Sequence, residues 1–144
     1  MNNKGKLYVI GIGPGSLDEM SIRAKKAIEE SEIIVGYTKY IKLIEPLIEG
    51  KEVFSTGMRG ELERVEYALN KSKSKTVSII STGDAGIYGM AGPILEMATN
   101  EEVIVIPGIT ASSSAASLLG APLMHDNCNI SLSDLLTPYE VIKN

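Results

Sequence analysis

Three glycine-rich turns, each following an apolar run, contain the residues of this chain that could do chemistry. Residues 83–89 (GDAGIYG) offer a carboxylate, backbone carbonyl oxygens and an aromatic ring, a set that suits a cationic or amino-bearing ligand. Residues 107–111 (PGITA) add the hydroxyl of Thr110, and residues 11–15 (GIGPG) follow the first apolar run. Glycine lets a backbone approach a ligand where a side chain would block it. The three turns therefore predict a small-molecule site.

The same residues have structural alternatives. Asp84 can close a turn with its side chain while Tyr88 packs on the sheet, and Thr110 can cap the helix that follows it. Arg59 stands just before a predicted helix, where it is either solvated or paired with an anion. One residue can serve both a turn and a ligand, so these alternatives stay open beside the predicted site.

The sequence lacks the motifs of several other enzyme classes. The G-x-G-x-x-G fingerprint of dinucleotide binding fails at Ser16, and the second apolar run ends in residues 35–37 (VGY) without the carboxylate that would hold a ribose. The sequence contains no Gly-Lys-Ser or Gly-Lys-Thr, so it has no P-loop. It has a single histidine, His125, and no serine in a G-x-S-x-G elbow, so it lacks a hydrolase triad. An NAD-dependent oxidoreductase and a hydrolase are therefore disfavoured.

The charge and the cysteine content of the chain argue against several kinds of binding partner. The 144 residues carry a net charge of -4 and no basic patch, so we expect no nucleic-acid binding. Cys128 is the single cysteine, which excludes an internal disulfide and fits a reducing cytoplasm; we expect it to pack as a small hydrophobe. No Cys or His spacing suits a metal, and no segment suits a membrane span. We expect a cytoplasmic protein without a resident metal.

Apolar runs and helical patterns alternate along the chain. The runs rich in β-branched residues, which indicate buried strands, are 7–12, 33–35, 53–54, 77–80 and 103–106. Helices are expected over residues 22–28, 60–72, 93–98 and 110–120. Ser21 or Ser16 can cap the first of these, and Leu62, Val65 and Leu69 form an apolar face of the second.

This order predicts an α/β fold, a doubly wound and mainly parallel five-stranded sheet with helices on both faces. Because ligands of such sheets bind at the carboxyl ends of the strands, we expect the three turns to line one rim.

The pattern changes after residue 121. We expect an N-terminal α/β domain over residues 1–121, a linker over 122–128, and the start of a second domain over 129–144. In that last segment we expect a strand at 129–132 and a helix that begins at Thr137 and Pro138. Six residues follow Pro138, so we expect a first domain followed by the opening of a second.

Six segments, in order along the chain, together resemble the tetrapyrrole methylase family. They are GIGPGSLDEMSIRA, VGYTKY, STGMRGELERVEYAL, STGDAGIYGMAG, PGITASSSAASLLGAPLMHD and ISLSDLLTPYEVI. The resemblance covers nearly all of the sequence. VGYTKY and ISLSDLLTP resemble the branch of this family that acts on precorrin-3B or cobalt-factor III in corrin-ring (cobalamin) synthesis.

The resemblance implies a methyltransferase that uses S-adenosylmethionine, methylates a ring carbon of a tetrapyrrole with ring contraction, and forms a homodimer. The cofactor residues that it implies are Gly83, Asp84, Ile87, Tyr88, Thr110 and Ala111. The residues implied on the substrate side are Gly11, Gly13, Pro14, Gly15 and Arg59. It assigns no catalytic acid or base.

Two alternatives stay open within this resemblance. A sister enzyme of the family that methylates another precorrin carbon would share most of the same segments. A non-catalytic role as an isolated binding domain is the other, because the resemblance covers only the first of two domains. We therefore expect the chain by itself to be inactive as a methyltransferase.

Overall fold

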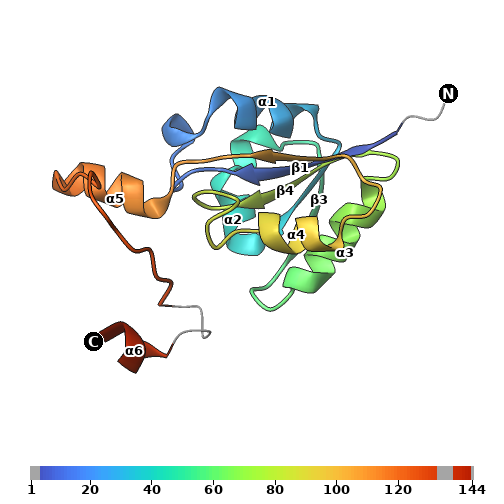
Figure 1. Cartoon of the computed structure of the whole chain (residues 1–144). Coiled ribbons are helices and arrows are strands. Elements are labelled where there is room, and N and C mark those ends of the chain that lie inside the picture. The colour runs from blue at the N-terminus through green and yellow to red at the C-terminus, as the bar shows by residue number, and fades with distance from the viewer. Residues whose placement is uncertain (1–3, 133–137, 144) are drawn as a thin grey trace. The chain divides into compact units, whose positions relative to one another are not determined.

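The computed structural model describes residues 4–132 and 138–143 (Figure 1). The chain divides into two compact units, Met1–Ala111 and Ser112–Asn144, and each is described by itself. The predicted domain boundary at residue 121 stays a prediction.

The first unit is a five-stranded parallel sheet with helices between its strands. Its strands are β1 (Lys6–Gly11), β2 (Ile33–Tyr37), β3 (Glu52–Thr56), β4 (Thr76–Ser81) and β5 (Val103–Ile106). The strand order is β3-β2-β4-β1-β5, and every pairing is parallel. The helices of this unit are α1 (Ile22–Glu30), α2 (Thr38–Leu43), α3 (Glu61–Lys71) and α4 (Ala91–Met97), with short 3-10 turns at Leu17–Glu19 and Glu45–Leu47. The predicted α/β fold is confirmed.

Each inner strand supplies side chains to two separate cores, because successive residues of a strand point to opposite faces. On one face Leu7 and Val9 pack with residues of α3 and α4. On the other face Tyr8 and Ile10 pack with residues of α1 and α2. Figure 1 shows α1 on one side of the sheet and α3 and α4 on the other. Coverage of both faces explains why the strands read as continuous apolar runs rather than as alternating ones.

Local signals set where the helices begin. Of the two serines predicted as alternative caps of α1, Ser21 is the cap, because its Oγ accepts the N–H of Ala24. Ser16 instead caps the preceding 3-10 turn, where its Oγ accepts the N–H of Asp18. The predicted apolar face of α3 was wrong at Leu62, whose side chain is 60% exposed. Leu62 lies in the first turn of α3, outside the stripe that faces the sheet.

The second unit contains two helices among its described residues, α5 (Ala111–Leu119), which starts at the last residue of the first unit, and α6 (Tyr139–Lys143). Gly120 follows α5 at a φ of +64°, which ends the helix where the sequence predicted. The predicted strand at 129–132 was wrong: these residues are irregular, and Leu132 is 71% exposed. A strand needs a neighbour for its backbone groups, and the described part of this unit contains no other strand. The predicted cap Thr137 lies outside the described residues.

No helix in the part of the chain that the structure describes combines the length and the apolar character needed to cross a bilayer.

Candidate functional site

The three glycine-rich turns lie together at the carboxyl edge of the sheet. They follow β1, β4 and β5, and the sheet order places β1 between β4 and β5. Because all five strands are parallel, their carboxyl ends share one edge, where open α/β sheets bind ligands. The prediction that the three turns line one edge of the sheet is confirmed.

A two-way backbone bridge joins the β1 turn to the β4 turn. The N–H of Gly13 donates to the carbonyl of Gly83 over 3.1 Å, and the N–H of Gly83 donates to the carbonyl of Gly13 over 2.7 Å. Both residues have a positive φ, +79° and +64°, a region that glycine enters without the strain that a Cβ brings. The two turns therefore form one hydrogen-bonded surface.

The carboxylate of Asp84 ties the β4 turn to the β5 turn. Its Oδ1 accepts the N–H of Gly108 over 2.9 Å, and its Oδ2 accepts the N–H of Gly86 over 2.8 Å. The first bond crosses between turns, and the second closes the β4 turn itself. The turn-closing role considered for Asp84 is therefore present. A carboxylate has about four acceptor sites, so these two bonds leave room for a ligand.

Gly108 sits where three backbone segments meet. A Cβ at this position would lie 2.3 Å from the carbonyl oxygen of Gly83 and 2.6 Å from that of Gly11, closer than real Cβ contacts allow. Both neighbours are backbone atoms, which cannot turn away as a side chain could. The residue type at Gly108 is thus fixed by the meeting of the three turns.

The β4 turn presents apolar side chains outward. Ile87 is 45% exposed and Tyr88 is 63% exposed, so the alternative in which Tyr88 packs on the sheet was wrong. Tyr88 has a φ of +52°, the one non-glycine residue with positive φ among those described. Such strained residues persist where the surroundings over-determine them and cluster at ligand sites. Here the Ser81 Oγ accepts the N–H of Met90 over 3.0 Å and fixes the far end of the turn.

Thr110 and Ala111 are the last two of the cofactor residues that the resemblance implied. A Cβ on Gly83 would lie 3.7 Å from the Thr110 Cα and from the Ala111 nitrogen, so these residues adjoin the β4 turn. Beside them, a hollow of about 380 Å³ is lined by residues 18–21 and 107–109. The structure thus brings together the implied cofactor residues and the β1 turn.

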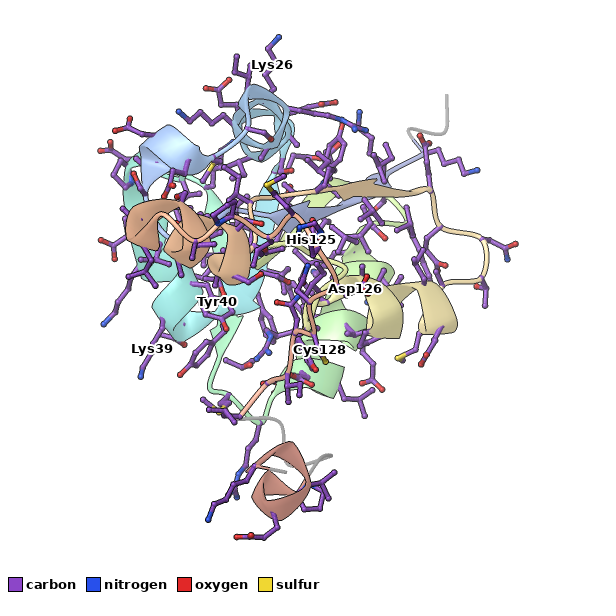
Figure 2. The ribbon with its side chains drawn as sticks, turned by 60° about the vertical axis from the view of Figure 1, so that its left-hand side comes forward. Lys26, Lys39, Tyr40, His125, Asp126 and Cys128 are labelled. Atoms are coloured by element: carbon purple, nitrogen blue, oxygen red, sulfur yellow. The ribbon has the colours of Figure 1, made fainter. Side chains whose placement is uncertain are left out.

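Arg59 lies on the same edge but not at the junction of turns. It is exposed in the turn after β3, which is two strands from β4 and three from β1. Strands are spaced by about 4.8 Å, so these ends lie roughly 10 and 14 Å apart across the sheet. The side chain of Lys39, the second residue of α2, extends away from the ribbon (Figure 2). The side chain of Lys26 extends outward from α1 in the same view. The rim therefore has a glycine-rich half and a second half, called the basic half below, that carries Lys39 and Arg59. Glu61 and Glu63 follow Arg59 at the start of α3.

Residues 6–143 match the family described as Tetrapyrrole (Corrin/Porphyrin) Methylases. The chain belongs to this family. It is 53% identical to a probable cobalt-factor III C(17)-methyltransferase of Salmonella typhimurium over 95% of its own length and 59% of the relative's. It is 51% identical to a cobalt-factor III methyltransferase of Priestia megaterium over 97% of its own length and 28% of the relative's.

Among solved structures, the methyltransferase CobJ shares this tetrapyrrole methylase fold with a TM-score of 0.86 and 38% identity. The likeness covers 96% of this chain and 61% of that one. The methylase chain thus spans less than two thirds of the length of each of these relatives.

Arg64 is a residue of the rim that sequence reasoning missed. Its side chain is 4% exposed, and its Nη1 donates to the Thr56 Oγ1 over 2.6 Å and to the Gly57 carbonyl over 2.8 Å. Burial is the main cause that lowers the pKa of this guanidinium, and the charge of Glu61 opposes it. The available signal was its spacing, since Arg64 precedes Ala68 by one helical turn on the buried face of α3.

Three polar residues of the second unit were also considered from the sequence. His125, Asp126 and Cys128 are exposed on the irregular segment that follows α5 (Figure 2). The expectation that Cys128 packs as a small hydrophobe was wrong, because this segment builds no core to receive it. Within residues 4–132 and 138–143, no three His, Cys, Asp or Glu side chains gather in a way that could hold a metal ion.

Proposed function

We propose that this methylase chain forms the cofactor half of an S-adenosylmethionine-dependent C-methyltransferase of corrin-ring synthesis. Its substrate is precorrin-3B or cobalt-factor III, and methylation accompanies ring contraction. The observation that carries the proposal is the junction of the β1, β4 and β5 turns through Gly13, Gly83, Asp84 and Gly108. Two relatives that are 51% and 53% identical to this chain are named cobalt-factor III methyltransferases, which supports this reaction.

The residues present fit a sulfonium cofactor. Neither residues 82–92 nor residues 107–111 contain a lysine or arginine, so no cation of the chain stands within the turns. The Asp84 carboxylate and the nearby carbonyl oxygens favour a positive charge, and Ile87 and Tyr88 offer apolar surface beside them. In this proposal Gly83, Asp84, Ile87 and Tyr88 border the methionine end of the cofactor, with Thr110 and Ala111 nearby.

The cofactor supplies an activated methyl group when bound. The task left to the chain is to hold donor and acceptor in line and to keep water out, which positioning alone can achieve for such a transfer. The turn at Gly11, Gly13, Pro14 and Gly15 faces the tetrapyrrole in this proposal. Arg59 pairs with one of the substrate's carboxylates at the basic half of the rim.

Two further features belong to the same proposal. The protein acts as a homodimer, as the resemblance to its family implies. It works in the cytoplasm, which a chain with a single cysteine and a net charge of -4 suits.

Calorimetric titration of the chain with S-adenosylhomocysteine tests the cofactor assignment, with NADH as the control ligand. S-adenosylhomocysteine lacks the methyl group but keeps nearly every other contact. We expect it to bind and NADH not to bind, because the rim lacks the strand-end carboxylate that holds a ribose. Binding of NADH alone would overturn the proposal. Binding of neither ligand would remove these turns as a self-sufficient cofactor site.

A further inference from the structure

The guanidinium of Arg64 is buried without an acidic partner. Arg64 takes part in neither of the ion pairs Lys6–Glu30 and Lys75–Glu52. Its own two bonds go to neutral oxygens of the turn after β3.

Such an arrangement is costly in free energy. Removing a charge from water costs several kcal/mol unless an opposite charge compensates it. Glu61 and Glu63, on the same helix, favour the charged form of Arg64 but lie outside the distance of an ion pair. The chain thus leaves Arg64 short of an anion.

One edge of the guanidinium remains available. In the described structure, Arg64 donates through Nη1 and makes no bond through Nε or Nη2. No fully buried side-chain nitrogen or oxygen among the described residues lacks a hydrogen-bond partner, so Nε and Nη2 are not completely sealed from the surface, although Arg64 as a whole is only 4% exposed. Nε and Nη2 form the flat fork that matches the two oxygens of a carboxylate.

The guanidinium lies at the end of β3, in the half of the rim that the proposed function assigns to the substrate. The oxygens that hold Nη1 belong to Thr56, the last residue of β3, and to Gly57 just after it. Tyr37, the last residue of β2, and Tyr40 of α2 meet edge to face with ring centroids 5.0 Å apart, and both tyrosines favour the charged form of Arg64. An anion at this position therefore meets a fixed cation between the ends of β2 and β3.

We propose that Arg64 binds a carboxylate of the substrate through Nε and Nη2 and so selects tetrapyrroles that carry an acidic arm at this position. The proposal rests on the proposed function for the identity of the substrate. Arg59 is exposed and must be ordered when it binds, whereas Arg64 is already held by Thr56 and Gly57. Pre-organisation reduces the entropy lost on binding, so Arg64 contributes the larger share of selectivity.

Porphyrin titrations with the chain as it stands test the proposal. The probes are uroporphyrin, whose arms all end in carboxylates, and its neutral octamethyl ester, each followed by porphyrin fluorescence. We expect Arg64→Gln to weaken uroporphyrin binding by about tenfold or more, the usual effect of losing a charge-assisted hydrogen bond. The same variant should leave ester binding within about twofold. The matched control is Lys26→Gln, which removes the positive charge of an exposed side chain on α1 (Figure 2) and should change neither affinity.

A second variant covers the structural role of Arg64. Arg64→Lys keeps the charge and one donor for the Thr56 oxygen but loses the fork, so we expect an intermediate affinity for uroporphyrin in a folded protein. Circular dichroism reports folding for each variant. A folded Arg64→Gln or Arg64→Lys variant that binds uroporphyrin as tightly as the wild type would overturn the proposal. A wild-type chain that does not prefer uroporphyrin to its ester would overturn it too.

The two proposals fail in different measurements. The S-adenosylhomocysteine titration tests the glycine-rich half of the rim, and the porphyrin titrations test the basic half. Wild-type discrimination between uroporphyrin and its ester that disappears in Arg64→Gln supports the carboxylate site even if the cofactor analogue does not bind. Equal loss of both ligands in a folded Arg64→Gln variant would point to a general structural effect and would refute the specific role.

Discussion

Replacing Asp84 by alanine should weaken both the stability of the first unit and its affinity for the cofactor. The carboxylate accepts the partly buried N–H of Gly108 and the exposed N–H of Gly86. A hydrogen bond to a charged group contributes about 1.5–3 kcal/mol and an exposed bond contributes less, so the two bonds together suggest a loss of about 3 kcal/mol. For a cooperative unit of this size, such a loss lowers Tm by roughly 10–15 °C.

The assay is urea unfolding followed by far-ultraviolet circular dichroism, with S-adenosylhomocysteine titration of the same samples. Asp84→Asn keeps one acceptor oxygen without the charge, so we expect about half the loss of unfolding free energy. Asp126→Ala is the matched control, because Asp126 is an exposed aspartate of the second unit (Figure 2). An Asp84→Ala variant as stable as the wild type would refute the tie between the turns. Unchanged ligand affinity would remove Asp84 from the proposed cofactor site.

Three further predictions concern the core, the junction of turns and an ion pair. Ile94→Ala empties a fully buried position of α4, so we expect a loss of about 2–5 kcal/mol in urea unfolding. Gly108→Ala should cost about 1–3 kcal/mol through backbone displacement and weaken S-adenosylhomocysteine binding by calorimetry, whereas Gly92→Ala, with open space around the new Cβ, should do neither. The hydrogen bond from Lys6 is the main cause that lowers the pKa of the Glu30 carboxyl in the folded protein. The charged Glu30 therefore stabilises the fold at pH values above its pKa in the unfolded chain, and this stabilisation is lost as the pH falls through its pKa in the folded protein. Glu30→Gln should therefore reduce the acid-side fall in unfolding free energy, and an identical pH profile for both proteins would contradict this.

The sequence was sufficient to predict the strands because their burial on both faces is written into continuous apolar runs. All five predicted runs overlap the strands of the structure, and the rim follows from the parallel arrangement alone. The cofactor set of Gly83, Asp84, Thr110 and Ala111 is also brought together, since its members follow strands on either side of β1. Which ligand these residues contact stays a prediction.

Other features depend on contacts between distant residues and could not be predicted locally. The bond from Gly108 to Asp84 spans 24 residues, and nothing in the sequence of either turn specifies it. The spacing of apolar residues in the sequence predicts that α3 is amphipathic. It does not reveal that Leu62 is exposed and Arg64 is buried. At 129–132 local β propensity suggested a strand, and the absence of a pairing partner decided otherwise.

The position of β1 in the sheet has a consequence for how the protein is made. β1 pairs with β4, which begins at Thr76, and with β5, which begins at Val103, so its partners are synthesised long after it. At about 5–20 residues per second, a ribosome needs roughly 4–14 s to pass from the end of β1 to the end of β4. During that interval the nascent chain carries the apolar segment Lys6–Gly11 without a strand to pair with. Pairing of β1 therefore waits for the second half of the first unit, whereas β2 and β3 can pair with each other as soon as residue 56 has been made.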